Sequence, residues 1–191
     1  MQIRLVHDQL TRIFNLLRTE TRKSGNRHGL LPVQVEILQY LCACNRYSNT
    51  PLAVAEYLGT TKGTVSQTLK ALERKGLVTK ETDPKDRRVV RLEVTRKGRQ
   101  VVDRIVPGEA FGAALARLPN EEGAQLPALL DQLLGAMEET THRSHFAPCR
   151  GCNHLELSTR TARCLRRGVT IPRKELELLC RDYEDASASA H

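Results

Sequence analysis

The residues with the most chemistry to offer are the cysteines, and four of the six lie in the C-terminal part of this 191-residue sequence. They follow the pattern Cys-x2-Cys-x11-Cys-x15-Cys, formed by Cys149, Cys152, Cys164 and Cys180. The sequence carries no signal peptide and no membrane-spanning run, so we expect a cytoplasmic protein. Clustered cysteines of cytoplasmic proteins are more often metal ligands or redox thiols than disulfides. The pattern therefore predicts a metal centre with four thiolate ligands.

The spacing of these cysteines bears on which metal they bind. Structural zinc sites commonly use two pairs of closely spaced ligands, whereas this sequence has one close pair and two single cysteines. An iron–sulfur cluster is larger and accepts ligands from more widely spaced positions. We therefore favour a two-iron or four-iron cluster, with zinc as the alternative. His142, His145 and His154 lie close enough in the sequence to replace one cysteine, and they are second choices as ligands.

The other two cysteines, Cys42 and Cys44, fall in a predicted helix that begins at Pro32. Residues two apart on a helix point to different sides, so this pair does not form one site. We interpret Cys42 as a core residue.

A second group of residues has the types and positions expected of a DNA-reading surface. Residues 59–99 include twelve basic and five acidic side chains, which is nearly the whole surplus behind the net charge of +8. Such a local surplus attracts a polyanion through release of its counterions. A predicted helix in this segment is capped by Thr60 or Thr61 and carries short polar side chains opposite an apolar stripe, as a helix in the major groove requires. The outward polar side chains belong to Thr61, Lys62, Thr64, Ser66, Gln67 and Lys70.

The elements that position these residues follow from periodicity and from turn residues. Four helices are predicted first, over Ile3 to about Lys23, from Pro32, from Pro51 to Gly59 and from Thr61 to Gly76. Two strands, LVTKE and RVVRLEV, are separated by the turn TDPKDR, which predicts a hairpin. Further helices are predicted from Thr95 to a break near Pro107-Gly108, over Ala110–Leu118 and over Pro127–Thr140. Short helices followed by a hairpin are the order of a winged helix-turn-helix.

At this point the sequence resembles a known family. The stretch TVSQTLKALERKGLVTKETDPKDRRVVRLEVTRKG is similar to the signature of the MarR family of transcriptional regulators, most diagnostically at Asp86-Arg87-Arg88. The likeness extends from about Leu5 to Thr140. It implies a homodimer that binds a palindromic operator in double-stranded DNA, usually as a repressor, with the N-terminal and C-terminal helices forming the dimer.

The resemblance also implies roles for single residues. Five positions match recognition-helix residues that face the major groove: Thr61, Thr64, Ser66, Gln67 and Lys70. Arg87 and Arg88 match the basic residues of the wing tip, one of which typically enters the minor groove or contacts phosphate. Lys85 belongs to the same basic turn and completes the expected DNA contacts, together with Lys62. Asp86 matches an acid that pairs with an arginine and shapes the wing.

The expected fold is mainly α-helical with a small β-hairpin wing, in four segments. Residues 1–31 form an N-terminal dimerisation helix, 32–98 the winged helix-turn-helix, 99–141 the C-terminal dimerisation helices, and 142–191 the cysteine-rich tail. The tail exceeds the length at which such chains usually end, so it is expected to hold the control element of the protein.

Two functions remain open from the sequence alone. The first is a regulator whose DNA binding responds to redox state, oxygen or iron through a tail-bound iron–sulfur cluster. The second has structural zinc in the tail and a small aromatic effector in the dimer crevice. An enzyme is not expected, because the sequence has no glycine-rich phosphate loop, nucleophile elbow or carboxylate pair. A protein-interaction adaptor is disfavoured by the intact basic wing, and the lack of Trp argues against single-strand or RNA recognition by stacking.

Overall fold

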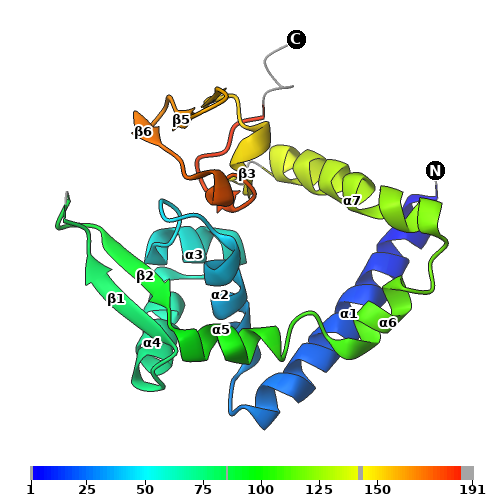
Figure 1. Ribbon diagram of the computed structural model, residues 1–191. Helices are drawn as coiled ribbons and strands as arrows, with labels where there is room; N and C mark the ends of the chain where they lie inside the picture. The colour runs from blue at the N-terminus through cyan, green and yellow to red at the C-terminus, as the bar shows by residue number, and fades with distance from the viewer. Residues whose placement is uncertain (1, 85, 142–143, 186–191) are drawn as a thin grey trace.

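A computed structural model describes residues 2–84, 86–141 and 144–185 of the chain. Its α-helices are α1 (Ile3–Arg27), α2 (Pro32–Ala43), α3 (Pro51–Leu58), α4 (Lys62–Arg74), α5 (Arg96–Asp103), α6 (Glu109–Leu115) and α7 (Asn120–Thr140). Its strands are β1 (Val78–Thr82), β2 (Val90–Val94), β3 (Ala147–Pro148), β4 (Leu155–Leu157), β5 (Ala162–Cys164), β6 (Val169–Thr170) and β7 (Leu179–Cys180). Two 3-10 turns, η1 (Cys149–Gly151) and η2 (Arg173–Glu175), lie in the tail. The chain is mainly helical with a small hairpin wing, as the sequence predicts (Figure 1).

The winged helix-turn-helix is built around one hydrophobic core. Helices α2, α3 and α4 pack together, the β1–β2 hairpin packs against α4, and α5 packs against α2. The predicted stripe of α4, Val65, Leu69 and Leu72, is buried in this core. Removing such an aliphatic side chain from water contributes about 1.5–3 kcal/mol, so the stripe fixes which face of α4 is left outward. Other fully buried members of the core are Leu30, Val35, Ile37, Leu38, Tyr40, Val54, Leu92 and Ile105.

The helix starts of this module are set by threonine caps. The side-chain oxygens of Thr50, Thr61 and Thr95 each accept a hydrogen bond from the backbone N–H three residues further on, at 3.2, 3.2 and 3.0 Å. These bonds satisfy N–H groups that a helix start otherwise leaves without an acceptor. Gly59 ends α3 in the left-handed conformation at φ 61°, which a glycine adopts without steric cost. The sequence-based starts at Pro51, Thr61 and Thr95 are therefore confirmed.

Helix α1 is longer than predicted. It continues past the predicted end near Lys23, through Ser24 and Gly25, and stops at Arg27. Gly25 is buried, and a Cβ at this position would lie 3.2 Å from both the carbonyl oxygen of Leu30 and a methyl group of Val35. This glycine therefore allows close packing instead of making a turn. Several apolar side chains of α1 are exposed in the single chain: Ile3, Leu5, Leu10, Ile13, Phe14 and Leu16.

The C-terminal helices also differ from the sequence-based bounds. Helix α5 ends at Asp103, slightly before the predicted break at Pro107-Gly108, and α6 follows as a short helix. Helix α7 begins at Asn120, so the predicted start at Pro127 is wrong. Pro127 is exposed within the helix, and because proline has no backbone N–H it makes no helical hydrogen bond to the carbonyl four residues before it. Exposed apolar side chains follow along α7: Leu129, Leu130, Leu133, Leu134 and Met137.

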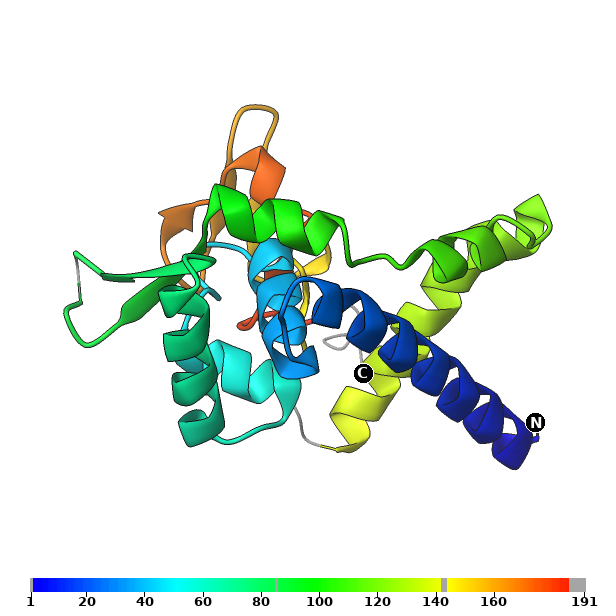
Figure 2. The same ribbon diagram turned by 90° about the horizontal axis from the view of Figure 1, so that it is seen from below.

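The tail forms a small unit of short antiparallel strands. Strand β3 pairs with β7, and β4, β5 and β6 form a second sheet. Cys164 and Cys180, the two single cysteines of the pattern, end β5 and β7. Strands of two or three residues are too short to show a two-residue alternation, so the sequence carries no sign of them. In both views the tail lies against the connection between α2 and α3 (Figures 1 and 2).

Candidate nucleic-acid interface and cysteine core

Helix α4 presents a polar face to solvent. All six polar residues predicted on its outer side, Thr61, Lys62, Thr64, Ser66, Gln67 and Lys70, are exposed. The hydroxyl of Thr61 is also the helix cap and lies 2.9 Å from the hydroxyl of Thr64. This face therefore offers hydroxyl, amide and ammonium groups on a rigid, well-packed helix. Such short polar groups are the ones that read base edges in the major groove.

The wing is the β1–β2 hairpin, whose register runs from the pair Val78 and Val94 to the pair Thr82 and Val90. At its tip the guanidinium of Arg88 binds the carboxylate of Asp86, with Nε–Oδ1 and Nη2–Oδ2 distances of 3.1 and 3.2 Å. The pairing expected for Asp86 is thus confirmed. These hydrogen bonds lower the pKa of Asp86 below its usual value.

The wing-tip cations keep their access to solvent. The Arg88 side chain is 91% exposed despite its ion pair, and Arg87 is also exposed. Lys85, the third predicted wing contact, lies outside the described residues. Two of the three predicted wing cations are therefore exposed at the tip of the wing.

A groove joins the two DNA-reading elements with the tail. It has a volume of about 520 Å³, and we call it the wing groove. Lys62 and Ser66 reach it from α4, Arg88 and Arg91 from the wing, and Arg167 from the tail. Its remaining lining residues are Tyr47, Thr50, Pro51, Leu52, Val89, Val90 and Arg181.

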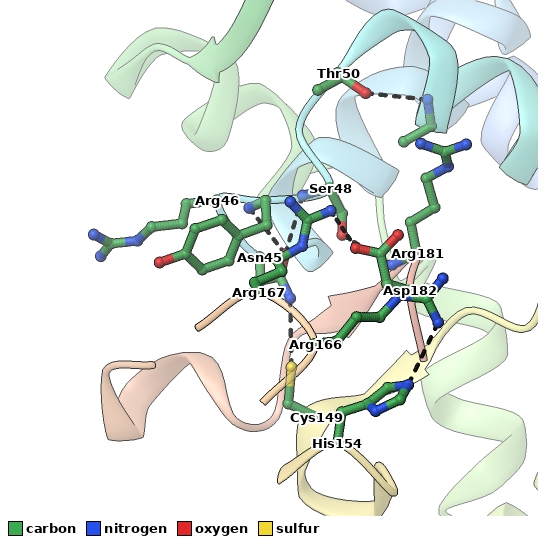
Figure 3. A network of polar contacts seen from close by, with 12 residues as sticks. Asn45, Arg46, Ser48, Thr50, Cys149, His154, Arg166, Arg167, Arg181 and Asp182 are labelled. Carbon is green, nitrogen blue, oxygen red and sulfur yellow. Dashed lines mark hydrogen bonds and ion pairs between the residues drawn. The ribbon is translucent and has the colours of Figure 1, made fainter. Parts of the chain in front are cut away.

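The tail is attached to the loop between α2 and α3 by a network of polar contacts (Figure 3). The side-chain amide of Asn45 donates to the sulfur of Cys149 at 3.4 Å, and its backbone N–H donates to the Leu179 carbonyl at 2.9 Å. The Ser48 hydroxyl oxygen accepts from the Arg181 backbone N–H at 2.9 Å. Two ion pairs frame these contacts, Arg46 with Glu175 and Arg181 with Glu56.

The same loop is bonded to the wing. Asn49 donates from its side chain to the Leu92 carbonyl at 3.1 Å, and the Leu92 backbone N–H returns a bond to the Asn49 carbonyl at 2.8 Å. Arg91 precedes Leu92 in β2, and its guanidinium binds the Arg46 carbonyl at 3.1 Å and the carboxylate of Asp83 at 2.8 Å. A continuous chain of hydrogen bonds therefore runs from the cysteines of the tail, through residues 45–49, to strand β2.

Two of the four tail cysteines lie next to each other. Cys149 and Cys180 are buried in the small core of the tail, each about 6% exposed. A hydrogen bond between their sulfurs raises the pKa of Cys149 and lowers that of Cys180 to about 6. Asn45 also lowers both pKa values by donating toward the sulfurs, since a donor favours a thiolate over a thiol.

The other two cysteines are less closely placed. Cys152 and Cys164 are partly buried; Cys164 packs against the same small core, and Cys152 is near enough to raise the pKa of Cys149 by charge repulsion. Among residues 2–84, 86–141 and 144–185, no group of three or more His, Cys, Asp or Glu side chains is already arranged as a metal site. The structure thus brings two of the four predicted ligands together, packs Cys164 against the same small core and leaves Cys152 partly buried nearby.

The alternative histidine ligands have carboxylate neighbours. His145 lies 3.4 Å from a Glu138 oxygen, and His154 lies 2.6 Å from a Glu184 oxygen. His142 lies outside the described residues. His145 and His154 are therefore each placed beside a carboxylate.

The two N-terminal cysteines are placed differently from the prediction. Cys44, and not Cys42, is the buried member, and it caps the end of α2 instead of lying within the helix. Burial raises the pKa of Cys44 to about 12 and also raises that of Cys42. Cys42 is half-buried against the core.

Sequence reasoning missed the residues that attach the tail. Asn45, Arg46 and Ser48 make their tail contacts across more than a hundred positions of sequence. The segment NRYSNT has the Asn and Ser content of a turn, which signals a loop but says nothing of its partner. No local pattern could have identified these contacts.

Comparison with known proteins finds relatives of this chain. Residues 28–89 match the family model described as MarR family. The HTH-type transcriptional regulator YkoM of Bacillus subtilis is 28% identical over 145 residues, which cover 68% of this chain and 91% of YkoM. The described part of the chain contains no helix long and apolar enough to cross a membrane.

Solved structures show the same fold. The transcriptional regulator Tm0710 of Thermotoga maritima is 28% identical, with a TM-score of 0.52 and coverage of 73% of this chain and 99% of that protein. MepR of Staphylococcus aureus in complex with DNA is 25% identical, with a TM-score of 0.54 and coverage of 68% and 96%. With its capped α4, its hairpin wing and these likenesses, the chain carries a winged helix-turn-helix that matches the MarR family over residues 28–89 and is similar to MarR-type transcriptional regulators.

Proposed function

We propose that two copies of this chain form a homodimer that binds a palindromic operator in double-stranded DNA and represses transcription. The observation that carries the proposal is the shared wing groove, where Lys62 and Ser66 of α4 and Arg88 of the wing face one concavity. In a winged helix-turn-helix the recognition helix enters the major groove while a neighbouring element contacts the backbone or minor groove. MepR, solved as a DNA complex, supports the same mode of binding.

The exposed apolar side chains support a dimer. On α1, Leu10 is 37% exposed and Phe14, one turn further along the same side, is 59% exposed, and on α7 Leu134 and Met137 are both more than half exposed. A contiguous apolar surface of this kind marks an interface with another protein. Because the two helices flank the DNA-reading module, a twofold pairing through them would present two α4 helices to two half-sites of a palindrome.

Each predicted contact has a role in this proposal. The polar face of α4 reads base edges, and Lys62 and Lys70 add charge next to the backbone. Arg87 and Arg88 occupy the adjacent minor groove or its phosphates. Asp86 holds Arg88 in place and is not itself a contact.

The wing assignment is tested with Arg87→Ala and a duplex from the promoter region of the protein's own gene. Each phosphate that is no longer neutralised reduces the slope of log K against log salt concentration by about 0.9, so a dimer with two such phosphates should change by about 1.8. Arg150→Ala is the matched control, because Arg150 is an exposed tail cation that pairs with Glu177 and lies outside the wing groove. Unchanged affinity and slope for Arg87→Ala would overturn the wing assignment.

DNA binding, we further propose, is controlled by a two-iron or four-iron cluster held by Cys149, Cys152, Cys164 and Cys180. Such a cluster would supply a charge that responds to redox state and oxygen, next to the small core of the tail. The proposal is supported by the adjacency of Cys149 and Cys180 and by the bond from Asn45 to Cys149. Binding of the cluster would require Cys152 and Cys164 to move toward Cys149 and Cys180. This movement would act on the loop between α2 and α3, which is hydrogen-bonded to the wing.

The alternative is structural zinc at the same cysteines, with a small aromatic effector in the dimer crevice. Anaerobic purification of the full chain, followed by iron, sulfide and zinc analysis, separates the two. Brown protein with iron and sulfide, which disappear in Cys149→Ser but remain in Cys42→Ser, supports the cluster. Colourless protein with stoichiometric zinc supports the alternative. Protein that binds neither metal overturns both.

A further inference from the structure

The tail supplies part of the wall of the wing groove. Arg167 comes from the turn between β5 and β6, and Arg181 follows β7, yet both line the same concavity as Lys62, Arg88 and Arg91. These five side chains are the charged members of its twelve-residue lining, and none of the twelve is a carboxylate. Four of them form ion pairs with carboxylates that do not line the groove: Arg88 with Asp86, Arg91 with Asp83, Arg167 with Asp182 and Arg181 with Glu56. A concavity whose lining side chains carry charge of one sign attracts a polyanion.

The position of the groove indicates which part of a duplex passes through it. When the recognition helix enters the major groove, the preceding helix crosses the sugar–phosphate backbone. Thr50, Pro51 and Leu52, at the start of α3, line the wing groove between α4 and the wing. The DNA strand whose sugar–phosphate backbone separates the major groove from the neighbouring minor groove therefore lies over the start of α3, with Arg167 beside it.

Arg167 is held in place by two contacts. Its guanidinium carbon lies 5.5 Å from the centre of the Tyr47 ring, and one of its amino groups binds the carboxylate of Asp182. A guanidinium carries five N–H donors in a fixed plane, so one ion pair does not use up its capacity to bind phosphate. The side chain stays 31% exposed at the groove. It is thus ordered before DNA arrives, which lowers the entropic cost of a contact.

We propose that the tail is a third DNA-contacting element, in which Arg167 binds a backbone phosphate of the strand that crosses the start of α3. This inference rests on the proposed function and extends it, because the tail would then contribute to operator affinity directly as well as through its cysteines. Arg181 lines the same wall, but its guanidinium is engaged by Glu56, so we assign it to holding the tail on α3.

The test compares Arg167→Ala with Arg166→Ala in the full-length protein. Arg166 is the adjacent cation, 53% exposed and lying near Glu184, and it does not line the wing groove. Both variants remove the same charge from the same turn. For Arg167→Ala we expect the salt slope of duplex binding to fall by about 1.8 for a dimer, at about 0.9 per phosphate, and affinity to fall several-fold. For Arg166→Ala we expect the wild-type slope.

A third variant distinguishes a phosphate contact from a structural role. Arg167→Lys keeps the charge and loses the planar contact with Tyr47, so it should keep the salt slope even if thermal unfolding shows a less stable tail. If the slope falls in Arg167→Lys as it does in Arg167→Ala, or if neither variant differs from Arg166→Ala, the proposal is wrong. Failure of the wild-type protein to bind any duplex would instead reject the proposed function on which the inference rests.

Discussion

The side-chain amide of Asn45 donates a hydrogen bond to the sulfur of Cys149 across 104 positions of sequence. Asn45 is fully buried, and its side-chain oxygen accepts from the backbone N–H groups of Tyr47 and Ser48, each at 3.0 Å. One side chain therefore both shapes the loop between α2 and α3 and contacts a cysteine of the tail. The DNA-reading module and the tail meet at this residue.

Asn45→Ala should destabilise the protein as a whole. The substitution removes the acceptor of the Tyr47 backbone N–H and the donor to the Cys149 sulfur, while the Ser48 N–H keeps the Asn45 backbone carbonyl as its acceptor. A buried polar group left without a partner costs about 1–3 kcal/mol. Urea unfolding of the full chain measures the decrease in the free energy of unfolding. Asn26→Ala, at an exposed position near the end of α1, is the control. A decrease no larger than that of the control would show that Asn45 does not join the two parts.

Phe14→Glu should convert the dimer to a monomer. Phe14 lies on the exposed apolar side of α1, and a carboxylate there would be removed from water without a partner in a dimer interface. Sedimentation velocity should show the mass falling from twice the chain mass of 21.5 kDa to that mass. Leu157→Glu places the same charge on an exposed leucine of the tail and should remain a dimer. A dimeric Phe14→Glu protein would exclude α1 from the interface.

The thiol of Cys44 should make folding stability fall at high pH. Burial raises its pKa from 9.0 to about 12, so above about pH 9 the unfolded chain releases a proton that the folded chain keeps. Stability from this group is complete below pH 9 and is lost as pH rises toward 12, by on the order of 4 kcal/mol at most. Urea unfolding between these pH values should show a difference in the free energy of unfolding between wild type and Cys44→Ala that shrinks as pH rises. A difference independent of pH would contradict the assignment.

The DNA-reading half of the fold was predictable because its signals are local. Thr61 and Thr95 cap helices, Gly59 ends one, and the stripe of Val65 and Leu69 marks the buried face of α4. Each of these features acts within a few residues of sequence. Together they predict the order of elements, and the conformation found matches it.

The errors in the helix bounds fell at a glycine and a proline, whose local signals allow more than one conformation. Gly25 is a residue type typical of turns, yet it lies inside α1. The backbone of Leu30 and the side chain of Val35 leave little room at its Cα for more than a hydrogen. Pro127 could begin a helix, yet α7 starts at Asn120 and carries the proline on its exposed side.

The tail was predictable in its chemistry and not in its structure. The spacing of Cys149 and Cys152 identified a group of thiols, but strands as short as β5 and β7 carry no periodic signal. The attachment of the tail depends on Arg46 with Glu175 and on Asn45 with Cys149, contacts that exist only once the chain has folded. Arg167 likewise lines the wing groove only because the tail folds against this loop.

Control of DNA binding by the cysteine tail is tested most directly by the affinity of one promoter duplex for the full-length protein in two states. The protein is purified anaerobically with its metal and is then compared, by fluorescence anisotropy, with the same preparation after chelation; Cys149→Ser provides a permanently metal-free form. A tail that controls the wing through Asn45 predicts affinities that differ by about tenfold or more, with Cys149→Ser matching the chelated protein. Equal affinities in all three samples would contradict control of DNA binding by the cysteine tail.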